Sequence, residues 1–442
     1  MRDIVVTIVI FGLLPLCLAR PWIGVLVWSW IGYMNPHRLT WGFAYFMPFA
    51  QLTAIATLAG LPFAPDRKPI PRSREVFLLV GLWVLFLVTS LNAFHPQTAW
   101  KYFTEVSKIL LITFVTMMLF QDERKLRSLL YVIAFSIGFF GLKGGIWALS
   151  TGGGNQVLGP PESFISGNTE MGLALNMVIP VLLILSRDDP RRWLRYLLLT
   201  TFFFSVIATL ITYSRGALLG LGVILPLLFL RSRAKFVVLP LALILAFFAR
   251  PLVDSVMPQQ WLERMGTIKT YEGDRSAQMR LNSWYVAYHL ALDHPLLGAG
   301  FKPFDKSVYM LYTPEEDLND TQDAHSIYFQ VMAEHGFVGL ALYLVLIVST
   351  LITLRQVMWR TRADPDRKAI NNMAQMIEVG LAGYLISGAF LSMSYFDLFF
   401  HYVAIAVVLK ALVAQPVTVT DATSAPAPVP VPQVVPTWLA RS

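Results

Sequence analysis

Three side chains in polar positions could act on a charged substrate. The first is Arg215, in Tyr213-Ser214-Arg215-Gly216, where two apolar runs meet. An arginine at the edge of the hydrocarbon is costly unless it pairs with an anion or extends to the interface. Basic residues are otherwise scarce on this predicted side of the membrane, which favours a bound anion over a simple interfacial anchor.

The other two residues are Arg280 and His325, both in a long polar stretch between apolar runs. Arg280 falls on the polar side of a helix predicted over 276–292, where taken alone it reads as a solvated surface arginine. His325 lies just before the chain returns to an apolar run. A neutral imidazole at this place could act as a general base near pH 7, although a lone loop histidine is more often structural.

The sequence predicts no metal site. The acidic stretch 315–323 lacks the regular ligand spacing of a calcium loop, so a solvated acidic surface is the better interpretation. The histidines His289, His294 and His335 have no metal-ligand spacing either. Cys17 is the only cysteine and lies inside an apolar run. Disulfides and thiolate metal sites are therefore excluded.

Composition predicts that these residues are positioned by membrane helices. Hydrophobic residues make up 56% of the chain and charged residues 14%, with a mean hydropathy of +0.58. A soluble domain could not cover so much apolar surface with so little charge. Residues 1–19 lack a signal-peptide cleavage site and are followed at once by another apolar run, which predicts a retained first span.

Thirteen apolar runs are candidate spans. They are about 4–19, 22–34, 43–60, 76–93, 103–120, 126–148, 169–186, 194–212, 216–231, 236–250, 337–354, 376–393 and 397–413. If 43–60 crossed the membrane, the basic loop 67–74 would fall outside. Because Pro48 lies within it and Pro62 follows it, we expect 43–60 to be re-entrant or interfacial, which leaves twelve spans.

The net charge of +8 reports orientation rather than nucleic-acid binding, because its basic residues lie beside predicted span ends. With twelve spans, twenty basic residues fall in one set of loops and three in the short loops of the other set. The twenty are Arg38, Arg67, Lys68, Arg72, Arg74, Arg124, Lys125, Arg127, Arg187, Arg191, Arg192, Arg195, Arg231, Arg233, Lys235, Arg355, Arg360, Arg362, Arg367 and Lys368; the three are Arg20, Lys101 and Arg215. We therefore expect both termini in the cytoplasm.

This topology divides the chain into four parts. Residues 1–250 form an N-terminal transmembrane bundle, 251–336 a partly helical periplasmic loop that carries the site, and 337–413 the C-terminal spans. The Pro-rich segment 414–442 has no periodic apolar face and is expected to be a disordered cytoplasmic tail. In the loop, helical spacing of apolar residues predicts an amphipathic helix over 276–292, ended by His294-Pro295.

An ordered set of motifs resembles the O-antigen ligase and polymerase superfamily. Tyr213-Ser214-Arg215-Gly216 is followed by Arg280-x-x-x-Trp284 and by the run 294–301, His-Pro-Leu-Leu-Gly-Ala-Gly-Phe. Ala324-His325-Ser326 and Glu334-x-Gly336-x-x-Gly339 complete the set, and 159–168 looks like the family's outer-loop segment. The resemblance covers roughly residues 160–400. The first ~100 residues resemble the N-terminal extension of O-glycosylation ligase-like members.

The resemblance implies an all-α polytopic fold like that of C-type membrane glycosyltransferases, in the bacterial inner membrane. It also implies transfer of a polysaccharide from undecaprenyl pyrophosphate to an acceptor hydroxyl on the periplasmic face, without metal, cofactor or nucleotide sugar. On this basis Arg215 and Arg280 would bind the donor pyrophosphate, and His325 would be the catalytic base. Among the acceptors that the family uses, we expect a sugar of lipid A–core.

Other acceptors and other classes stay open. A protein O-oligosaccharyltransferase and an O-antigen or exopolysaccharide polymerase belong to the same superfamily. A transporter or flippase would need charged residues near the bilayer midplane, for which Glu105 and Lys108 are the only hints. Lys108 and Lys143 also lie within predicted spans and could line the donor cavity, although structural pairing or snorkelling is the better interpretation. A non-catalytic envelope scaffold is the remaining alternative.

Overall fold

The chain is all-α wherever its structure is described. The computed structural model describes residues 1–231, 275–313 and 321–415, and these ranges contain helices and no strand. The α-helices are α1 (Arg2–Ala19), α2 (Pro21–Met34), α3 (Phe49–Gly60), α4 (Arg74–Leu91), α5 (Pro96–Leu119), α6 (Glu123–Ser150), α7 (Asn168–Asp188), α8 (Arg192–Leu210), α9 (Arg215–Leu230), α12 (Arg275–Asp293), α13 (Lys306–Tyr312), α14 (Ile327–Thr361), α15 (Lys368–Gly388) and α16 (Asp397–Ala414). Short 3₁₀ turns occur at Pro36–Leu39, Phe43–Phe46, Leu61–Phe63 and Pro365–Arg367.

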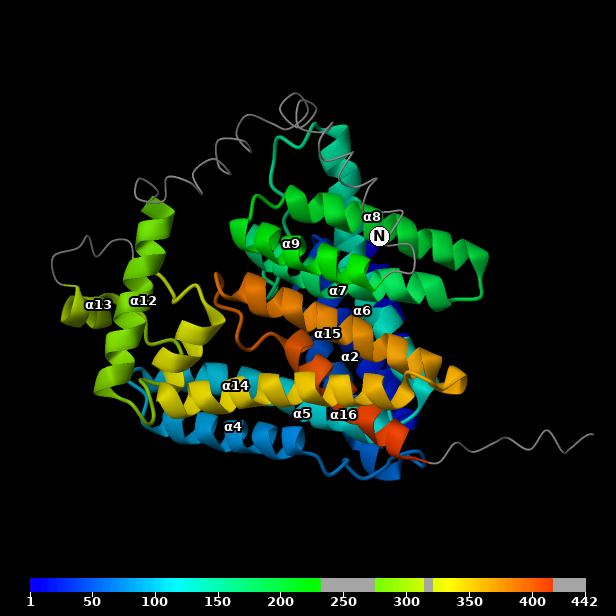
Figure 1. The fold of residues 1–442 in the computed structure, drawn as a ribbon, viewed down its shortest axis with the longest axis horizontal. Helices are drawn as coiled ribbons and strands as arrows, with labels where there is room; N and C mark the ends of the chain where they lie inside the picture. The colour runs from blue at the N-terminus through cyan, green and yellow to red at the C-terminus, as the bar shows by residue number, and fades with distance from the viewer. Residues whose placement is uncertain (232–274, 314–320, 416–442) are drawn as a thin grey trace, which may run out of the picture.

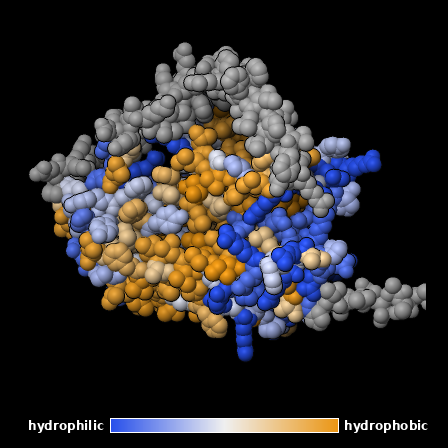
Figure 2. Space-filling model, in the orientation of Figure 1, coloured by the Kyte–Doolittle hydropathy of each residue, from blue (hydrophilic) through white to orange (hydrophobic). Residues whose placement is uncertain are grey.

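Eight of these helices are long and apolar enough to cross a membrane: α1, α4, α5, α6, α7, α8, α14 and α16. Figure 2 shows apolar side chains over the middle of the bundle and hydrophilic ones towards its two ends. An apolar girdle between polar ends matches a hydrocarbon core bounded by water. The expected multi-pass membrane protein is confirmed at this level.

Among the described residues, three predicted spans, α2, α9 and α15, do not meet the criterion of length and apolar character. With a rise of about 1.5 Å per residue, α2 (14 residues) and α9 (16 residues) are about 21 and 24 Å long, and α3 (12 residues), in the segment expected to be re-entrant or interfacial, is about 18 Å long. These lengths fall short of a ~30 Å hydrocarbon core. In α15 the first half carries Asn371, Asn372, Gln375 and Glu378, which lowers its hydropathy. The total of twelve spans stays a prediction.

Several predicted segments lie outside the described residues. They are the span at 236–250, the first part of the loop up to residue 274, the acidic residues 315–320 and most of the Pro-rich tail. The four-part division of the chain also stays a prediction.

The centre of the bundle is α7, which packs against α6, α8, α9 and α15. Most residues of α7 are buried, from Met171 to Ser186. A helix that is apolar on all sides is typical of such an enclosed position. Helix α14 packs on α4, α15 and α16, and also on α12, which stands with α13 at one end of the bundle (Figure 1).

Two details of the predicted loop are confirmed. Helix α12 occupies 275–293 and ends just before His294-Pro295. Its apolar face buries Val286, Ala287 and Leu290 in a small cluster with residues of α13 and α14. The predicted span at 337 follows a break in α14, because Gly336 has non-helical backbone angles of φ 68° and ψ −172°.

Candidate functional site

Helix α12 holds the segment that precedes His325. The Trp284 indole Nε1 donates a hydrogen bond to the Ala324 carbonyl at 2.8 Å. The same ring stacks on Phe329 of α14, with centroids 5.1 Å apart and planes at 7°. The Tyr309 hydroxyl donates to the Gln322 carbonyl at 2.8 Å. These contacts fix the backbone on the N-terminal side of the histidine.

Arg280 lies four residues before Trp284, and so on the same face of α12. It lines a small recess of about 20 Å³ together with Arg215. The lining residues are Thr169, Tyr213, Ser214, Arg215, Gly216, Arg280, Ser387, Phe390 and Leu391. The structure thus brings together two arginines that are 65 positions apart in the sequence.

The turn before α9 sets the position of Arg215 as the first residue of that helix. Tyr213 adopts a left-handed backbone, φ 58°, and its hydroxyl donates to the Gly153 carbonyl at 2.8 Å. The Ser214 Oγ accepts a hydrogen bond from the Ala217 N–H at 3.2 Å. A serine cap of this kind satisfies one of the free amides at a helix start and fixes where the helix begins.

A larger cavity of about 290 Å³ adjoins this recess, and Leu391 lines both. Its ionisable side chains come from five separate segments of the chain. They are Tyr102, Glu105, Glu170, Lys302, Asp323, His325, Glu334 and Tyr395. The recess, lined by two cations, suits an anionic group. The cavity, whose lining carries both signs of charge, suits a polar group that is not strongly charged.

The loop 294–301 docks on the break in α14. The Ala299 and Gly300 amides donate to the carbonyls of Ala333 and Glu334 at 3.0 and 2.9 Å, and the Phe337 amide donates to the Pro295 carbonyl at 2.8 Å. This pairing leaves no room for a side chain at Gly298 or Gly336. A Cβ on Gly298 would lie 2.6 Å from the Ala333 carbonyl oxygen, and one on Gly336 would lie 2.6 Å from that of Pro295. The two glycines of the motifs are therefore required by close approach and by positive φ.

Glu334 was not predicted as a site residue. Its carboxylate is buried and accepts hydrogen bonds from the Tyr395 hydroxyl at 2.6 Å and from the Lys302 amide at 3.2 Å. The Gln330 side chain donates to it at 3.3 Å. A carboxylate at the start of a long apolar run was the available signal, because buried acids in membrane proteins usually line functional cavities.

Lys302 was also missed. Its ammonium forms an ion pair with Asp323 and lies 5.5 Å from the centre of the Tyr102 ring. Burial alone would lower the pKa of Lys302, but the carboxylates of Asp323 and Glu334 more than offset it and raise the pKa. Lys302 therefore stays a cation at neutral pH and contributes positive charge to the cavity.

His325 is partly buried and has a left-handed backbone, φ 44°. Burial lowers the pKa of His325 below its usual value, and the Arg280 charge lowers it further. The carboxylates of Asp323 and Glu170 act in the opposite direction without cancelling the effect. The imidazole is thus neutral at pH 7, which is the form that can accept a proton.

The remaining candidates lie elsewhere. Lys108 and Lys143 are absent from the lining of both spaces. His335 is buried, with its two ring nitrogens at 2.8 Å from the hydroxyls of Thr89 and Tyr395. His335 therefore holds α14 to α4 and to the segment before α16, rather than facing a substrate.

Two ranges of the chain match known protein families. Residues 200–344 match the family described as O-antigen ligase, and this range contains all three predicted site residues. Residues 1–189 match a family of unknown function. The chain has no match among curated proteins. The match supports a membrane glycosyltransferase of ligase or polymerase type. The match over residues 200–344 confirms the resemblance inferred from the motifs.

Proposed function

We propose that this protein transfers a glycan from undecaprenyl pyrophosphate to an acceptor hydroxyl, most readily that of lipid A–core, on the periplasmic face of the inner membrane. The observation that supports it best is the pairing of Arg215 and Arg280 in one recess beside a cavity that contains a neutral His325. Two cations suit a leaving pyrophosphate, and a neutral imidazole suits a hydroxyl.

The arginines would act on the leaving group. As the bond from the anomeric carbon to the pyrophosphate oxygen breaks, its electron pair passes to that oxygen. Guanidinium groups stay charged at any relevant pH and bind phosphate oxygens through two parallel hydrogen bonds. Because Arg215 starts a helix, the free amides and positive end of α9 add to the attraction. Charge stabilisation of this kind replaces a metal ion in the proposed reaction.

His325 would act on the acceptor. Its imidazole nitrogen takes the proton as the acceptor oxygen forms the new bond to the anomeric carbon. Attack from the side opposite the pyrophosphate inverts the configuration at that carbon. Lys302 and Glu334 do not take part in this step. Their contacts with Asp323 and with the docked loop position the backbone around the histidine.

Reconstitution tests this proposal. Purified protein in liposomes receives lipid-linked glycan and one of three acceptors: lipid A–core, an acceptor protein or free glycan. We expect product with lipid A–core, without ATP or an ion gradient, in the presence of EDTA, and none with the variant His325→Ala. Product only with protein or glycan would assign the oligosaccharyltransferase or polymerase reaction instead.

Two results would contradict the proposed chemistry. The first is loss of activity in EDTA with rescue by one divalent ion, which would place a metal at the acidic stretch 315–323. The second is movement of the lipid-linked donor across the bilayer without any transfer, which would make the protein a flippase.

A further inference from the structure

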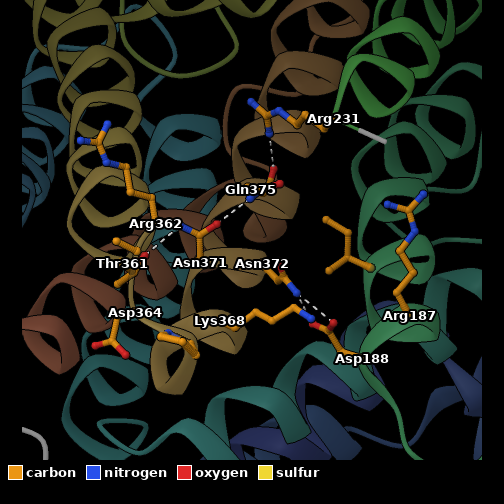
Figure 3. Close-up of a pocket in the computed structure, with 13 residues that line it drawn as sticks. Arg187, Asp188, Arg231, Thr361, Arg362, Asp364, Lys368, Asn371, Asn372 and Gln375 are labelled. Atoms are coloured by element: carbon orange, nitrogen blue, oxygen red, sulfur yellow. Dashed lines mark hydrogen bonds between the residues drawn. The ribbon is translucent and has the colours of Figure 1, made fainter. Parts of the chain in front are cut away.

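The same helices that carry the candidate site enclose a second, larger cavity at their other ends. Its volume is about 750 Å³. The candidate site lies at the N-terminal ends of α7, α9 and α14 and at the C-terminal end of α15. The second cavity lies at the opposite end of each of these four helices. The lining residues are Ile184, Arg187, Asp188, Arg231, Thr361, Arg362, Ala363, Asp364, Pro365, Lys368, Asn371, Asn372 and Gln375 (Figure 3).

Three cations of this cavity have no carboxylate partner in the part of the chain that the structure describes. They are Arg187 from α7, Arg362 at the end of α14 and Lys368 at the start of α15, and all three are exposed. Figure 3 shows Arg187 and Arg362 on opposite sides of the cavity. The fourth cation, Arg231, is paired with Glu378. Positive charge is therefore left over for a bound group.

The two acids of the lining form no ion pair with these three cations in the described part of the chain. The Asp188 carboxylate accepts two hydrogen bonds from the Asn372 side-chain amide, both at 2.8 Å. The Asp364 carboxylate forms its ion pair with Arg367, outside the cavity, at 3.3 Å. Each acid is thus engaged with a group other than the three cations.

The wall formed by α15 is held in place by amide hydrogen bonds. The Asn371 side chain donates to the Thr361 hydroxyl at 2.8 Å and to the Met358 carbonyl at 2.9 Å, and Gln375 donates to Asn371 at 2.6 Å (Figure 3). The Arg231 guanidinium donates to the Gln375 carbonyl at 2.9 Å. These hydrogen bonds fix the α15 wall of the cavity, which also carries Lys368.

Neutralisation of helix ends accounts for only part of this arrangement. Cations near the C-terminal ends of α7, α9 and α14 offset the negative ends of those helices. However, Lys368 stands at the start of α15, where the helix end is positive, and it gains nothing from that effect. A ligand that carries negative charge accounts for Lys368 as well as for the arginines.

We propose that this cavity binds the phosphate group of a phosphate ester, through Arg187, Arg362 and Lys368. Arginine and lysine together at the polar end of a membrane bundle recognise phosphate, and basic pockets between transmembrane helices bind anionic head groups. The phosphate can belong to an anionic phospholipid of the adjacent leaflet or to a soluble ester. The inference does not depend on the proposed glycan transfer.

The test compares two triple variants in detergent by native mass spectrometry. One removes the cavity cations, as Arg187→Gln, Arg362→Gln and Lys368→Gln. The control, Arg124→Gln, Arg192→Gln and Arg360→Gln, removes three exposed cations that do not line the cavity but lie near the ends of α6, α8 and α14 on the same predicted side. The lipid probes are phosphatidylglycerol, cardiolipin and phosphatidylcholine. The soluble probes are inorganic phosphate and glycerol 3-phosphate.

We expect the wild-type protein to retain an anionic probe. The cavity variant should bind that probe at least about tenfold more weakly, because each charge-assisted contact is strong. The affinity of the control variant should change less than about twofold. Retention of the anionic lipids alone would identify a head group as the ligand. Retention of the soluble probes, with the same loss in the cavity variant, would identify a soluble ester. Equal losses in both variants, no loss in either, or equal retention of phosphatidylcholine would overturn the proposal.

Discussion

At the scale of single residues, the candidate site concentrates backbone strain. Tyr213, Lys302 and His325 all have positive φ, at 58°, 53° and 44°, which is uncommon outside glycine. Such conformations persist only where surrounding contacts hold them, and they cluster at functional sites. Here the contacts are the Tyr213 hydroxyl on Gly153, the Lys302 amide on Glu334, and Trp284 on the residue before His325.

A pH profile tests the role of His325 as a base. Only the neutral imidazole accepts a proton, so the rate rises with pH through the pKa of His325. Burial and then Arg280 lower this pKa below the usual value of about 6.5. We therefore expect kcat/KM to be flat around pH 7 and to fall only below the ordinary histidine range. In Arg280→Gln the fall in kcat/KM at low pH should move to higher pH, because a positive charge that lowers the pKa of His325 is gone.

The matched control is Arg192→Gln, which changes a distant, exposed arginine and should leave the low-pH part of the profile unchanged. If the fall in kcat/KM at low pH stays at the same pH in Arg280→Gln, or moves to lower pH, then a group other than His325 controls the rate.

The sequence identifies some of the site residues and not others, for a physical reason. Arg215 stands out because it interrupts a junction of apolar runs, and Arg280 and His325 follow from their order in the motifs. Glu334 and Lys302 meet only because the loop 294–301 docks on a broken helix. Contacts between segments so far apart in the sequence depend on tertiary packing, which the local pattern of apolar and polar residues does not reveal.

At the scale of elements, the broken helix α14 is the part that aligns the site. The sequence predicts α12 from the helical spacing of its apolar residues, and the span after residue 336 from a long apolar run. It does not predict that a short helix precedes Gly336, separated from that span by a kink, and carries Gln330 and Glu334 into the cavity. The break depends on a glycine that accepts φ 68° and on a loop that pairs with the freed backbone groups.

Replacement of this glycine should destabilise the protein. In Gly336→Ala the left-handed backbone alone costs roughly 1–2 kcal/mol, and the new Cβ would lie 2.6 Å from the Pro295 carbonyl oxygen. We expect a lower midpoint of thermal unfolding in detergent and a loss of transfer activity. Gly81→Ala is the control, since its Cβ would meet nothing within 4 Å and α4 is helical there. Alanine should stabilise that helix by about 0.5–1 kcal/mol. Equal midpoints for the two variants would show that the break is not strained.

At the scale of the whole molecule, the two polar ends of the bundle carry different sites. The candidate transferase site and the basic cavity lie at opposite ends of α7, α9, α14 and α15. Helix α15, with 21 residues, is about 31 Å long at 1.5 Å per residue, so the ends lie roughly one hydrocarbon thickness apart. The excess of basic residues near the larger cavity predicts that this end faces the cytoplasm.

Cysteine labelling tests this orientation. Cys17 is buried and is first replaced by serine to remove the background. A cysteine at Ser276 should then react with an impermeant maleimide in intact spheroplasts, because residue 276 lies at the end that carries the candidate site. A cysteine at Ala363, which is exposed beside the basic cavity, should react only after lysis. Labelling of Ala363 from outside would reverse the orientation and place the candidate site in the cytoplasm.

The most direct test of the account measures donor binding and turnover on the same purified variants. His325→Ala should bind lipid-linked donor nearly as well as wild type and lose about 10²–10⁴-fold in turnover, as expected for a lost general base. Arg280→Ala should weaken donor binding and lose about 10²–10³-fold in rate. Arg215→Lys should also weaken donor binding, because lysine lacks the planar fork. If His325→Ala keeps more than about a tenth of wild-type turnover, well above that range, His325 is not the base. If it abolishes donor binding as fully as the arginine variants do, His325 belongs to the pyrophosphate site and the proposed division of roles is wrong.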